Sequence, residues 1–491
     1  MKMPCILSID QSTAATKALI FDAQGNLIAR ADRPHEQKIS PQGWVSHDPR
    51  EIYANTIAAV RELVSKAGIG GDRIAAVGIS NQRETALVWD RRTGRPLADA
   101  VVWQCSRAEP ICRRLADKAG FIRRRTGLPL SPYFSASKIA WLLEQNPSLG
   151  GAAQTAAGCC AGTMDAWLLY QLTGGKSFAT DLSNASRTQL FNIFSLQWDE
   201  EVCALFGVNR ESLPRLLPSD ALFGETDFEG LLGKPVPIHA VLGDSHAAFY
   251  GQGCLSRGMI KATYGTGSSV MMNAGDKPLL SERGIVSSVG FAVGGKIAYV
   301  LEGNINYSGA VLSWLVHDLG LLASAKEAGA VAAAANPEDT TYLVPAFTGL
   351  GAPHWKSGAR AMLCGMSRNT GRAEIVRAAE ESIAYQIADI AALMREEAKL
   401  PLAELRVDGG PTGDAFLMQF QSDILDSPVA ASTFEELSGA GAAFAAGIAI
   451  GLYDESVFSR IERRTYTPAI SPAERTRRKA GWDAAVRTVM S

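Results

Sequence analysis

The stretch Ala240-Val-Leu-Gly-Asp-Ser-His-Ala-Ala248 decides the fold, because an apolar strand-like run ends there in a carboxylate, Asp244, that small residues follow. The same pattern opens the chain, where Ile6-Leu-Ser-Ile-Asp-Gln-Ser-Thr13 ends an apolar run in Asp10. Each half therefore contains a strand that leads into a tight turn of small residues. Two such turns facing one another could hold a triphosphate, a metal ion and an acceptor hydroxyl. The pattern indicates phosphoryl transfer by an α/β protein.

Composition narrows the class of protein. A chain of 491 residues is too long for one compact core, so we expect two domains, 1–249 and 250–491. Hydrophobic residues make up 47% and charged residues 20%, as in ordinary globular proteins. The net charge of −2 gives no electrostatic reason to expect nucleic acid or an anionic membrane as partner. No signal stretch or bilayer-length apolar run is present, which predicts a cytoplasmic protein.

The eight cysteines contain no CxxC pair, and Cys159 and Cys160 are adjacent. This spacing suits neither a structural disulfide nor a zinc site, so the sequence predicts reduced, buried thiols.

Local patterns in the first half predict strands followed by helices, and the second half repeats this order. Asp48-Pro-Arg-Glu51 is typical of a helix start, with a capping Asp and Pro at the first position. The apolar run 74–79 predicts a buried strand that leads into a polar cluster at 80–85. A long amphipathic helix is expected over 373–395. Leu405-Arg-Val-Asp-Gly-Gly410 reads as a strand and a glycine turn, with a helix from about Asp414.

Candidate phosphate-binding residues lie in three turns. The turn at 10–17 offers backbone N–H groups and the side chains of Gln11, Ser12 and Thr13, while Asp10 could hold Mg²⁺ directly or through water. Thr266 lies between two glycines, which let the backbone approach a ligand closely. Glycines 409 and 410 suit a nucleotide at a strand-to-helix turn. Taken singly, each motif is equally compatible with an ordinary hairpin or glycine turn.

A second group of side chains suits an acceptor with several hydroxyls. Arg83 and Glu84 at a strand end could grip vicinal hydroxyls, and Trp103 and Tyr133 could supply apolar walls. Asp244 could take the proton of the attacking hydroxyl. The alternatives are a surface ion pair beside two core aromatics, and a helix-capping role for Asp244.

Taken together, the motifs resemble the FGGY carbohydrate kinases, and the glycerol kinases most closely within that family. The resemblance covers nearly the whole chain in colinear order. It rests on the following segments: Gly43-Trp-Val-Ser-His-Asp-Pro49, Asn81-Gln-Arg-Glu-Thr85, Val102-Trp-Gln-Cys105, 180–192, Tyr133-Phe-Ser-Ala-Ser-Lys-Ile-Ala-Trp-Leu142, 344–353, 361–381 and 405–425.

The resemblance implies an α/β fold of two actin/Hsp70/sugar-kinase type domains. Each would have a ribonuclease-H-like mixed sheet flanked by helices, with ATP, Mg²⁺ and a small polyol or sugar in the cleft between them. By resemblance, Asp244 matches the general base and Asp10 the Mg²⁺-associated carboxylate. The remaining matches are Arg83, Glu84, Trp103 and Tyr133 in the acceptor site, Thr13 near the transferred phosphate, and Thr266, Gly309, Gly409 and Gly410 around the nucleotide.

Several positions depart from the glycerol kinase pattern. Ser245 follows the base where Gln is usual, and Ser269 stands where an aromatic packs on glycerol. Ser12 replaces Gly in the phosphate turn, Asp414 falls in a segment that usually has paired Asn near the adenine, and Glu380 replaces an apolar residue. The two serines at the acceptor site shorten side chains, which favours a longer polyol such as erythritol. Glycerol itself remains the counter-hypothesis, and a pentulose, as in xylulokinases, is a further alternative.

A rival of another class is a non-catalytic sugar sensor or chaperone-like ATPase on the same fold. The acceptor cluster with Asp244 argues against it, because a chaperone needs no polyol site. A nicotinamide-dependent dehydrogenase would require GxGxxG after the first strand, which is missing. The resemblance also favours a homodimer or homotetramer, although no interface signature is visible.

Overall fold

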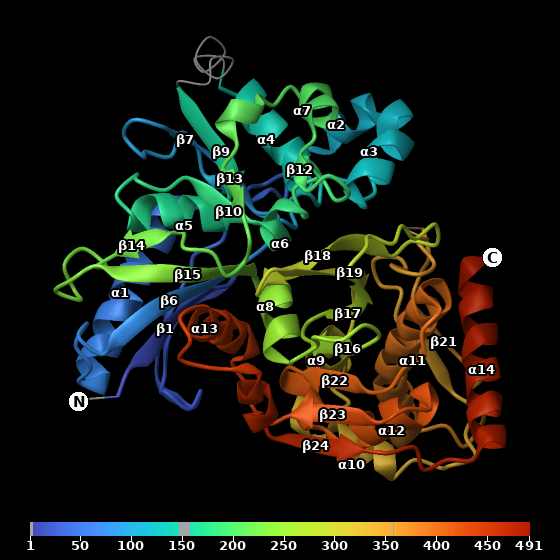
Figure 1. Ribbon diagram of the computed structural model, residues 1–491. Helices are drawn as coiled ribbons and strands as arrows, with labels where there is room; N and C mark the ends of the chain where they lie inside the picture. Colours follow the sequence, from blue (N-terminus) through green and yellow to red (C-terminus); the bar gives the residue numbers. More distant parts are fainter. Residues whose placement is uncertain (1–2, 147–157, 357) are drawn as a thin grey trace.

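The computed structural model describes residues 3–146, 158–356 and 358–491, and the chain forms two halves, each built on a mixed sheet. Figure 1 shows them side by side, with α8 (Asp244–Gly251) and α13 (Leu437–Ala449) between the two sheets. The α/β class of two domains with helix-flanked mixed sheets is confirmed. No helix among the described residues is long and apolar enough to cross a membrane.

The first half is organised by a six-stranded sheet in which the central strands β1, β6 and β15 are parallel. Its strands in spatial order are β14 (Gly224–Thr226), β15 (Val236–Gly243), β6 (Ile74–Asn81), β1 (Cys5–Gln11), β2 (Ala15–Phe21) and β3 (Leu27–Pro34). A five-stranded sheet lies beside it, ordered β4 (Lys38–Ile39), β5 (Val45–His47), β8 (Ala100–Val101), β7 (Ala86–Asp90) and β9 (Cys159–Thr163). The helices of this half are α1 (Pro49–Ala67), α2 (Glu109–Arg114), α3 (Ala119–Thr126), α4 (Ser135–Glu144), α5 (Met164–Leu172), α6 (Leu182–Ala185) and α7 (Glu200–Leu205), followed by α8.

The second half repeats this plan: antiparallel strands come first, then two parallel strands and an antiparallel edge strand. Its seven-stranded sheet is ordered β18 (Val286–Val293), β19 (Lys296–Ile305), β17 (Ser268–Gly275), β16 (Ile260–Tyr264), β22 (Leu405–Asp408), β23 (Val429–Ser432) and β24 (Arg463–Tyr466). The other elements of this half are α9 (Gly309–His317), α10 (Ala328–Ala333), β20 (Tyr342–Val344), β21 (Met362–Cys364), α11 (Arg372–Ala398), α12 (Ala415–Leu425), α13 and α14 (Pro472–Met490). The first half also contains two small strand pairs, β10 (Ala179–Asp181) with β13 (Arg215–Leu217) and β11 (Phe191–Asn192) with β12 (Gln197–Trp198).

The first sheet is buried on both faces, as expected for central strands that are apolar at consecutive positions. In β1, Leu7 belongs to a core with α1 and α5, while the adjacent Ile6 belongs to a core with α8 and α13. Because α13 follows residue 250 in sequence, the second half of the chain covers one face of the first half's sheet. Small residues allow α13 to pack closely against α8. A Cβ on Gly441 of α13 would lie only 1.8 Å from the carbonyl oxygen of Ala247 in α8, so a larger residue would not fit there.

Several local predictions are confirmed. Asp48 caps α1 by accepting a hydrogen bond from the backbone N–H of Arg50, and Pro49 occupies the first turn. The helix expected at 373–395 is α11, and Asp414 caps α12. The turn expected over 10–17 is shorter than predicted, because β1 continues to Gln11 and β2 begins at Ala15, with the two strands paired antiparallel. The alternative in which Asp244 caps a helix differs in position, because Asp244 is the first residue of α8 and Gly243 occupies the cap position.

Candidate functional site

Asp244 is the first residue of α8, directly after β15, and α8 lies between the sheets of the two halves (Figure 1). Its carboxylate accepts a hydrogen bond of 2.6 Å from the backbone N–H of Ser245, and Arg83 Nε lies 3.3 Å from its Oδ1. The start of a helix favours a negative charge. About 32% of the side chain is exposed, so a carboxylate held at a defined position remains open to a ligand.

Arg83 and Glu84 do not form the surface ion pair that was one alternative; they belong to a buried network. Arg83 donates two hydrogen bonds to Glu302 in β19, at 3.0 and 2.9 Å. Arg187 donates to Glu84 at 2.6 Å and lies 2.9 Å from Glu302. Burial alone would raise the pKa of Glu302, but Arg187 and Arg83 hold it well below its usual range. The network therefore holds Arg83 beside Asp244 and joins the two halves of the molecule.

His246 contacts the guanidinium group of Arg83. It is fully buried, with its Nδ1 3.4 Å from Arg83 Nη1 and its Nε2 3.3 Å from the hydroxyl of Ser288. A guanidinium can only donate, so Nδ1 accepts and the proton lies on Nε2. Burial and the positive charge of Arg83 lower the pKa of His246 well below its ordinary value, which keeps the ring neutral.

The sequence predicts two serines at the acceptor site, Ser245 and Ser269. Ser269, in β17, donates a hydrogen bond of 3.2 Å to Glu302 Oε1, so its hydroxyl joins the same network. Ser245 follows Asp244 in α8 and is partly exposed. Neither side chain forms an apolar wall; both present small polar groups.

Trp103 and Tyr133 pack together, with their ring centroids 5.4 Å apart in an edge-to-face arrangement. The indole N–H of Trp103 donates to the hydroxyl of Thr13 at 3.0 Å. This bond joins the aromatic pair to the turn between β1 and β2. The structure thus brings the predicted acceptor residues next to the predicted phosphate turn.

Asp10 lies on β1 and is buried, and it accepts a hydrogen bond of 2.9 Å from Ser80. Burial raises its pKa to about 6, although nearby Lys17 opposes the shift. In the adjoining turn the hydroxyl of Ser12 donates to the carbonyl of Ala15 at 2.9 Å, and Gln11 donates to the carbonyl of Ser12. The side chains of Gln11 and Ser12 thus stabilise the turn itself.

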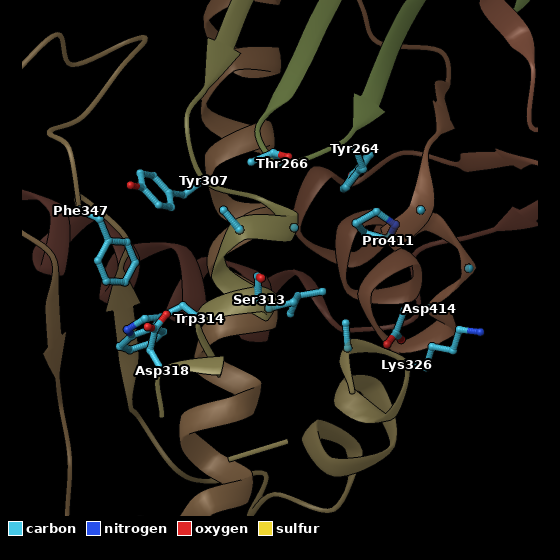
Figure 2. A pocket seen from close by; sticks show the side chains of 17 residues that line it. Tyr264, Thr266, Tyr307, Ser313, Trp314, Asp318, Lys326, Phe347, Pro411 and Asp414 are labelled. Carbon is cyan, nitrogen blue, oxygen red and sulfur yellow. The ribbon is translucent and has the colours of Figure 1, made fainter. Parts of the chain in front are cut away.

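A cavity of 1080 Å³ opens in the second half, between α9, η4 (Ala325–Glu327) and η5 (Gly410–Gly413). Four predicted nucleotide residues line it: Thr266, Gly309, Gly410 and Asp414. Figure 2 shows Pro411, Asp414 and Lys326 at one end and the aromatic residues Tyr307, Phe347 and Trp314 at the other. Its size is that of sites for large organic ligands. Gly409 does not line the cavity but forms the turn behind it.

Gly409 has a φ of 101°, and a Cβ there would lie 2.0 Å from the carbonyl oxygen of Tyr264. Gly409→Ala is therefore expected to lower the free energy of unfolding by about 1–3 kcal/mol, because the substitution forces a strained backbone and displaces β16. Nucleotide binding should weaken as well, because the next residue, Gly410, lines the cavity and would be displaced. Gly413→Ala is the control, because its Cβ would meet nothing within 4 Å. Thermal unfolding would measure both; equal stability of the two variants would contradict the prediction.

Sequence reasoning missed Glu302, Arg187 and His246 as site residues. Glu302 left a signal, since it is a single carboxylate after the apolar strand run 297–301. Arg187 lies in the segment 180–192, on which the family resemblance rests, but no role was predicted for it. The cavity residues Tyr307, Ser313, Trp314 and Phe347 were not predicted either. Of these, Phe347 lies in the segment 344–353, on which the resemblance rests, and the other three lie outside the segments given for it.

Comparison with known proteins places this geometry in a family. The sequence models of the FGGY family of carbohydrate kinases match the chain, the N-terminal domain over residues 5–251 and the C-terminal domain over residues 260–450. The chain belongs to the FGGY carbohydrate kinases. Glycerol kinase 1 of Thermotoga maritima is 45% identical and covers 99% of both chains. The glycerol kinase of Symbiobacterium thermophilum is 43% identical over 98% of this chain and 97% of its own.

Among solved structures, Plasmodium falciparum glycerol kinase with ADP superimposes with a TM-score of 0.94 at 34% identity, covering 100% of this chain and 99% of its own. As an FGGY carbohydrate kinase, the chain uses ATP with Mg²⁺ to phosphorylate a hydroxyl of a small polyol or sugar. The recognition of the family from sequence motifs is confirmed.

Proposed function

We propose that the chain is a polyol kinase whose acceptor, glycerol or a slightly longer polyol, binds beside Asp244. The observation that carries the proposal is Asp244 itself: an accessible carboxylate 3.3 Å from a buried arginine, at the head of a helix between the two halves. Asp244 takes the proton of the acceptor hydroxyl as that hydroxyl attacks the γ-phosphorus.

The nucleotide occupies the cavity of the second half, with its phosphates directed toward the turn between β1 and β2. The groups that hold it in this proposal are Gln11, Ser12 and Thr13 on one side and Thr266, Gly309, Gly409, Gly410 and Asp414 on the other. Closure of the two halves would exclude water, so that the polyol rather than water is the nucleophile.

Asp10 is the proposed Mg²⁺ ligand. Among the described residues no group of three or more His, Cys, Asp or Glu could hold a metal ion. Mg²⁺ nevertheless needs only one or two carboxylates beside phosphate oxygens and water. A buried carboxylate whose pKa is raised to about 6 fits this role, since a cation would offset its burial. When bound, Mg²⁺ neutralises charge on the phosphate oxygens.

Arg83, Glu84, Trp103 and Tyr133 bind the acceptor in this proposal. Glycerol is supported by the relatives named glycerol kinases, which are 41–45% identical over nearly the full length. A longer polyol such as erythritol is the second candidate. It is favoured by the short side chains of Ser245 and Ser269. The hydroxyl of Ser269 donates to Glu302, so this position carries a small polar group in place of an aromatic side chain. A pentulose is less supported, since the solved xylulose kinases are only 19–21% identical and share the fold alone.

We further propose that the enzyme acts in the cytoplasm and assembles as a dimer or tetramer. Support comes from the membership of the FGGY carbohydrate kinases and from the similarity to glycerol kinases. Sedimentation at working concentration would measure the assembly.

The test is ADP release from Mg·ATP in a coupled assay with glycerol, erythritol, threitol, xylitol, ribitol, xylulose and ribulose. We expect turnover with a three- or four-carbon polyol and little with the ketoses. Preference for glycerol would assign Ser245 and Ser269 as tolerated replacements, and preference for erythritol would make them specificity residues. Lack of stimulation by every compound would overturn the kinase proposal in favour of a sensor or chaperone-like ATPase.

A further inference from the structure

Lys138 is a buried lysine that the proposed function does not use. It lies on α4, within the segment 133–142 on which the family resemblance rests, and none of its surface is exposed. Its ammonium group donates to three successive backbone carbonyls, those of Pro132 at 2.7 Å, of Phe134 at 3.2 Å and of Tyr133 between them. An ammonium group has three donors, so each donor finds an acceptor. We call this arrangement the carbonyl clamp.

The carbonyl clamp holds the turn that precedes α4. In this turn the N–H of Phe134 donates to the carbonyl of Ser131 at 3.3 Å, and the N–H of Tyr133 donates to the hydroxyl of Ser131 at 3.2 Å. Phe134 occupies the cap position of α4, and its side chain makes no capping hydrogen bond. A side chain in a helix leans toward the preceding turn, so a lysine four positions after the cap reaches these carbonyls. Lys138 therefore ties the main chain of the turn to the body of the helix.

The turn carries an aromatic ring of the predicted acceptor site. The ring of Tyr133 lies edge-to-face against Trp103, with centroids 5.4 Å apart, and against Phe134 at 5.3 Å. The next residue, Ser135, donates to the carbonyl of Glu84 at 3.1 Å, which brings a second acceptor residue to the same segment. Side chains occupy discrete rotamers, so a displaced main chain displaces the ring that it carries. The place of the Tyr133 ring therefore depends on the carbonyl clamp.

We propose that Lys138 is a positioning residue of the acceptor site, which fixes the main chain of Tyr133 and thereby the ring that the acceptor contacts. The inference rests on the proposed function, in which Tyr133 binds the acceptor. Without the ammonium group the three carbonyls lose their shared donor, and the turn moves to satisfy them elsewhere. The ring then has no single fixed position, so the acceptor binds more weakly. None of the clamp residues lines the nucleotide cavity, so ADP binding should not change.

The expected effect is a rise in the KM for the acceptor of about tenfold, with kcat within about threefold of the wild type. A contact that is equally strong in the bound substrate and in the transition state changes KM and leaves kcat nearly unchanged. A loss of folded protein, by contrast, lowers the apparent kcat and leaves KM as it is. The split between the two constants thus separates positioning from stability.

The alternative route runs through the charge of Glu84. Burial lowers the pKa of Lys138 to about 7, and the negative charge of Glu84 opposes this shift, so the two groups interact. A double-mutant cycle distinguishes the two routes, because it measures whether the effect of one residue requires the other. If Lys138 acts through Tyr133, the effect of Lys138→Met on KM disappears once Tyr133→Ala has removed the ring.

The experiment is steady-state kinetics of the full-length protein with its best acceptor at saturating Mg·ATP. Lys138→Met and Lys138→Gln are compared with wild type, and Lys138→Met is also made in a Tyr133→Ala background. Methionine has a similar length and no donor, while the amide of glutamine keeps two donors without the charge. Ser137→Ala is the matched control, since Ser137 is buried on the same helix and its hydroxyl donates to the carbonyl of Phe134, at 3.5 Å, instead of to that of Tyr133. Calorimetry with Mg·ADP shows which variants fold.

We expect the KM to rise by about tenfold in Lys138→Met, by less in Lys138→Gln, and by less than about twofold in Ser137→Ala. In the Tyr133→Ala background, Lys138→Met should change the KM by less than about twofold. The Kd for Mg·ADP should stay at the wild-type value in every variant.

An unchanged KM in Lys138→Met and Lys138→Gln would overturn the inference and leave the kinase proposal intact. The same rise in the Tyr133→Ala background, or an equal rise in Ser137→Ala, would overturn it as well. If neither Lys138 variant binds Mg·ADP, the lysine serves the fold as a whole and the inference is wrong. A wild type that shows no turnover with any polyol or ketose would instead contradict the proposed function, so the two failures are distinguishable.

Discussion

Asp244→Asn is expected to lower kcat by about 10²–10⁴-fold, the usual contribution of a general base. Asparagine is isosteric, and its oxygen can still accept from Arg83 Nε and from the Ser245 N–H, which contact Oδ1 of the native carboxylate. Arg83 also keeps its two hydrogen bonds to Glu302. The geometry should therefore survive while the basicity is lost, and ADP binding should remain close to that of the wild type.

Steady-state kinetics with the best acceptor and calorimetry with Mg·ADP would measure the two quantities separately. Asp48→Asn is a suitable control, because Asn caps a helix as well as Asp does. Asp48 caps α1 and otherwise lies 3.8 Å from the exposed Lys38. Near-normal turnover in Asp244→Asn would remove Asp244 as the base and leave it as a helix-terminal carboxylate.

Glu302→Gln is expected to lower the free energy of unfolding by about 3–5 kcal/mol, because it removes the negative charge that two buried guanidinium groups share and leaves only one acceptor oxygen for them. Glu302 is 0% exposed by its side chain, and Arg83 and Arg187 are only 6% and 1% exposed. The negative charges of Glu84 and Asp244 would remain as the partners of the positive charges of Arg187 and Arg83. The KM for the acceptor should rise, because Arg83 would lose one of the two hydrogen bonds to residue 302 that orient it.

The same carboxylate should make stability depend on pH. Although burial opposes it, Arg187 and Arg83 hold the pKa of Glu302 below its unfolded value. A depressed pKa contributes stability above the unfolded pKa, about 4.3, and that contribution is lost as pH falls below it. Acid unfolding should thus be less steep in Glu302→Gln.

Denaturant unfolding at pH 7 and pH 4 would test both expectations. Glu200→Gln is the control, since Glu200 pairs with Arg210 on the surface, with side chains 74% and 50% exposed. Such a pair contributes about 0–1 kcal/mol. Equal stability of the two variants would show that the buried network is dispensable.

The sequence by itself determined the local elements and the chemistry. The cap at Asp48, the helix α11 and the strand-to-turn junctions at Asp10 and Asp244 depend on residues close together in the chain, whose hydrogen bonds and periodicity can be read directly. The colinear motifs also identified the family. Phosphoryl transfer could therefore be predicted before any contact was known.

Only the tertiary structure decided which side chains meet. Arg83 and Glu302 are 219 residues apart, and Trp103 and Thr13 are 90 apart, yet each pair is joined by a hydrogen bond. The shortened turn after Gln11 depended on the pairing of β1 with β2. Such contacts depend on how sheets and helices close around a shared core, and no local pattern encodes that closure.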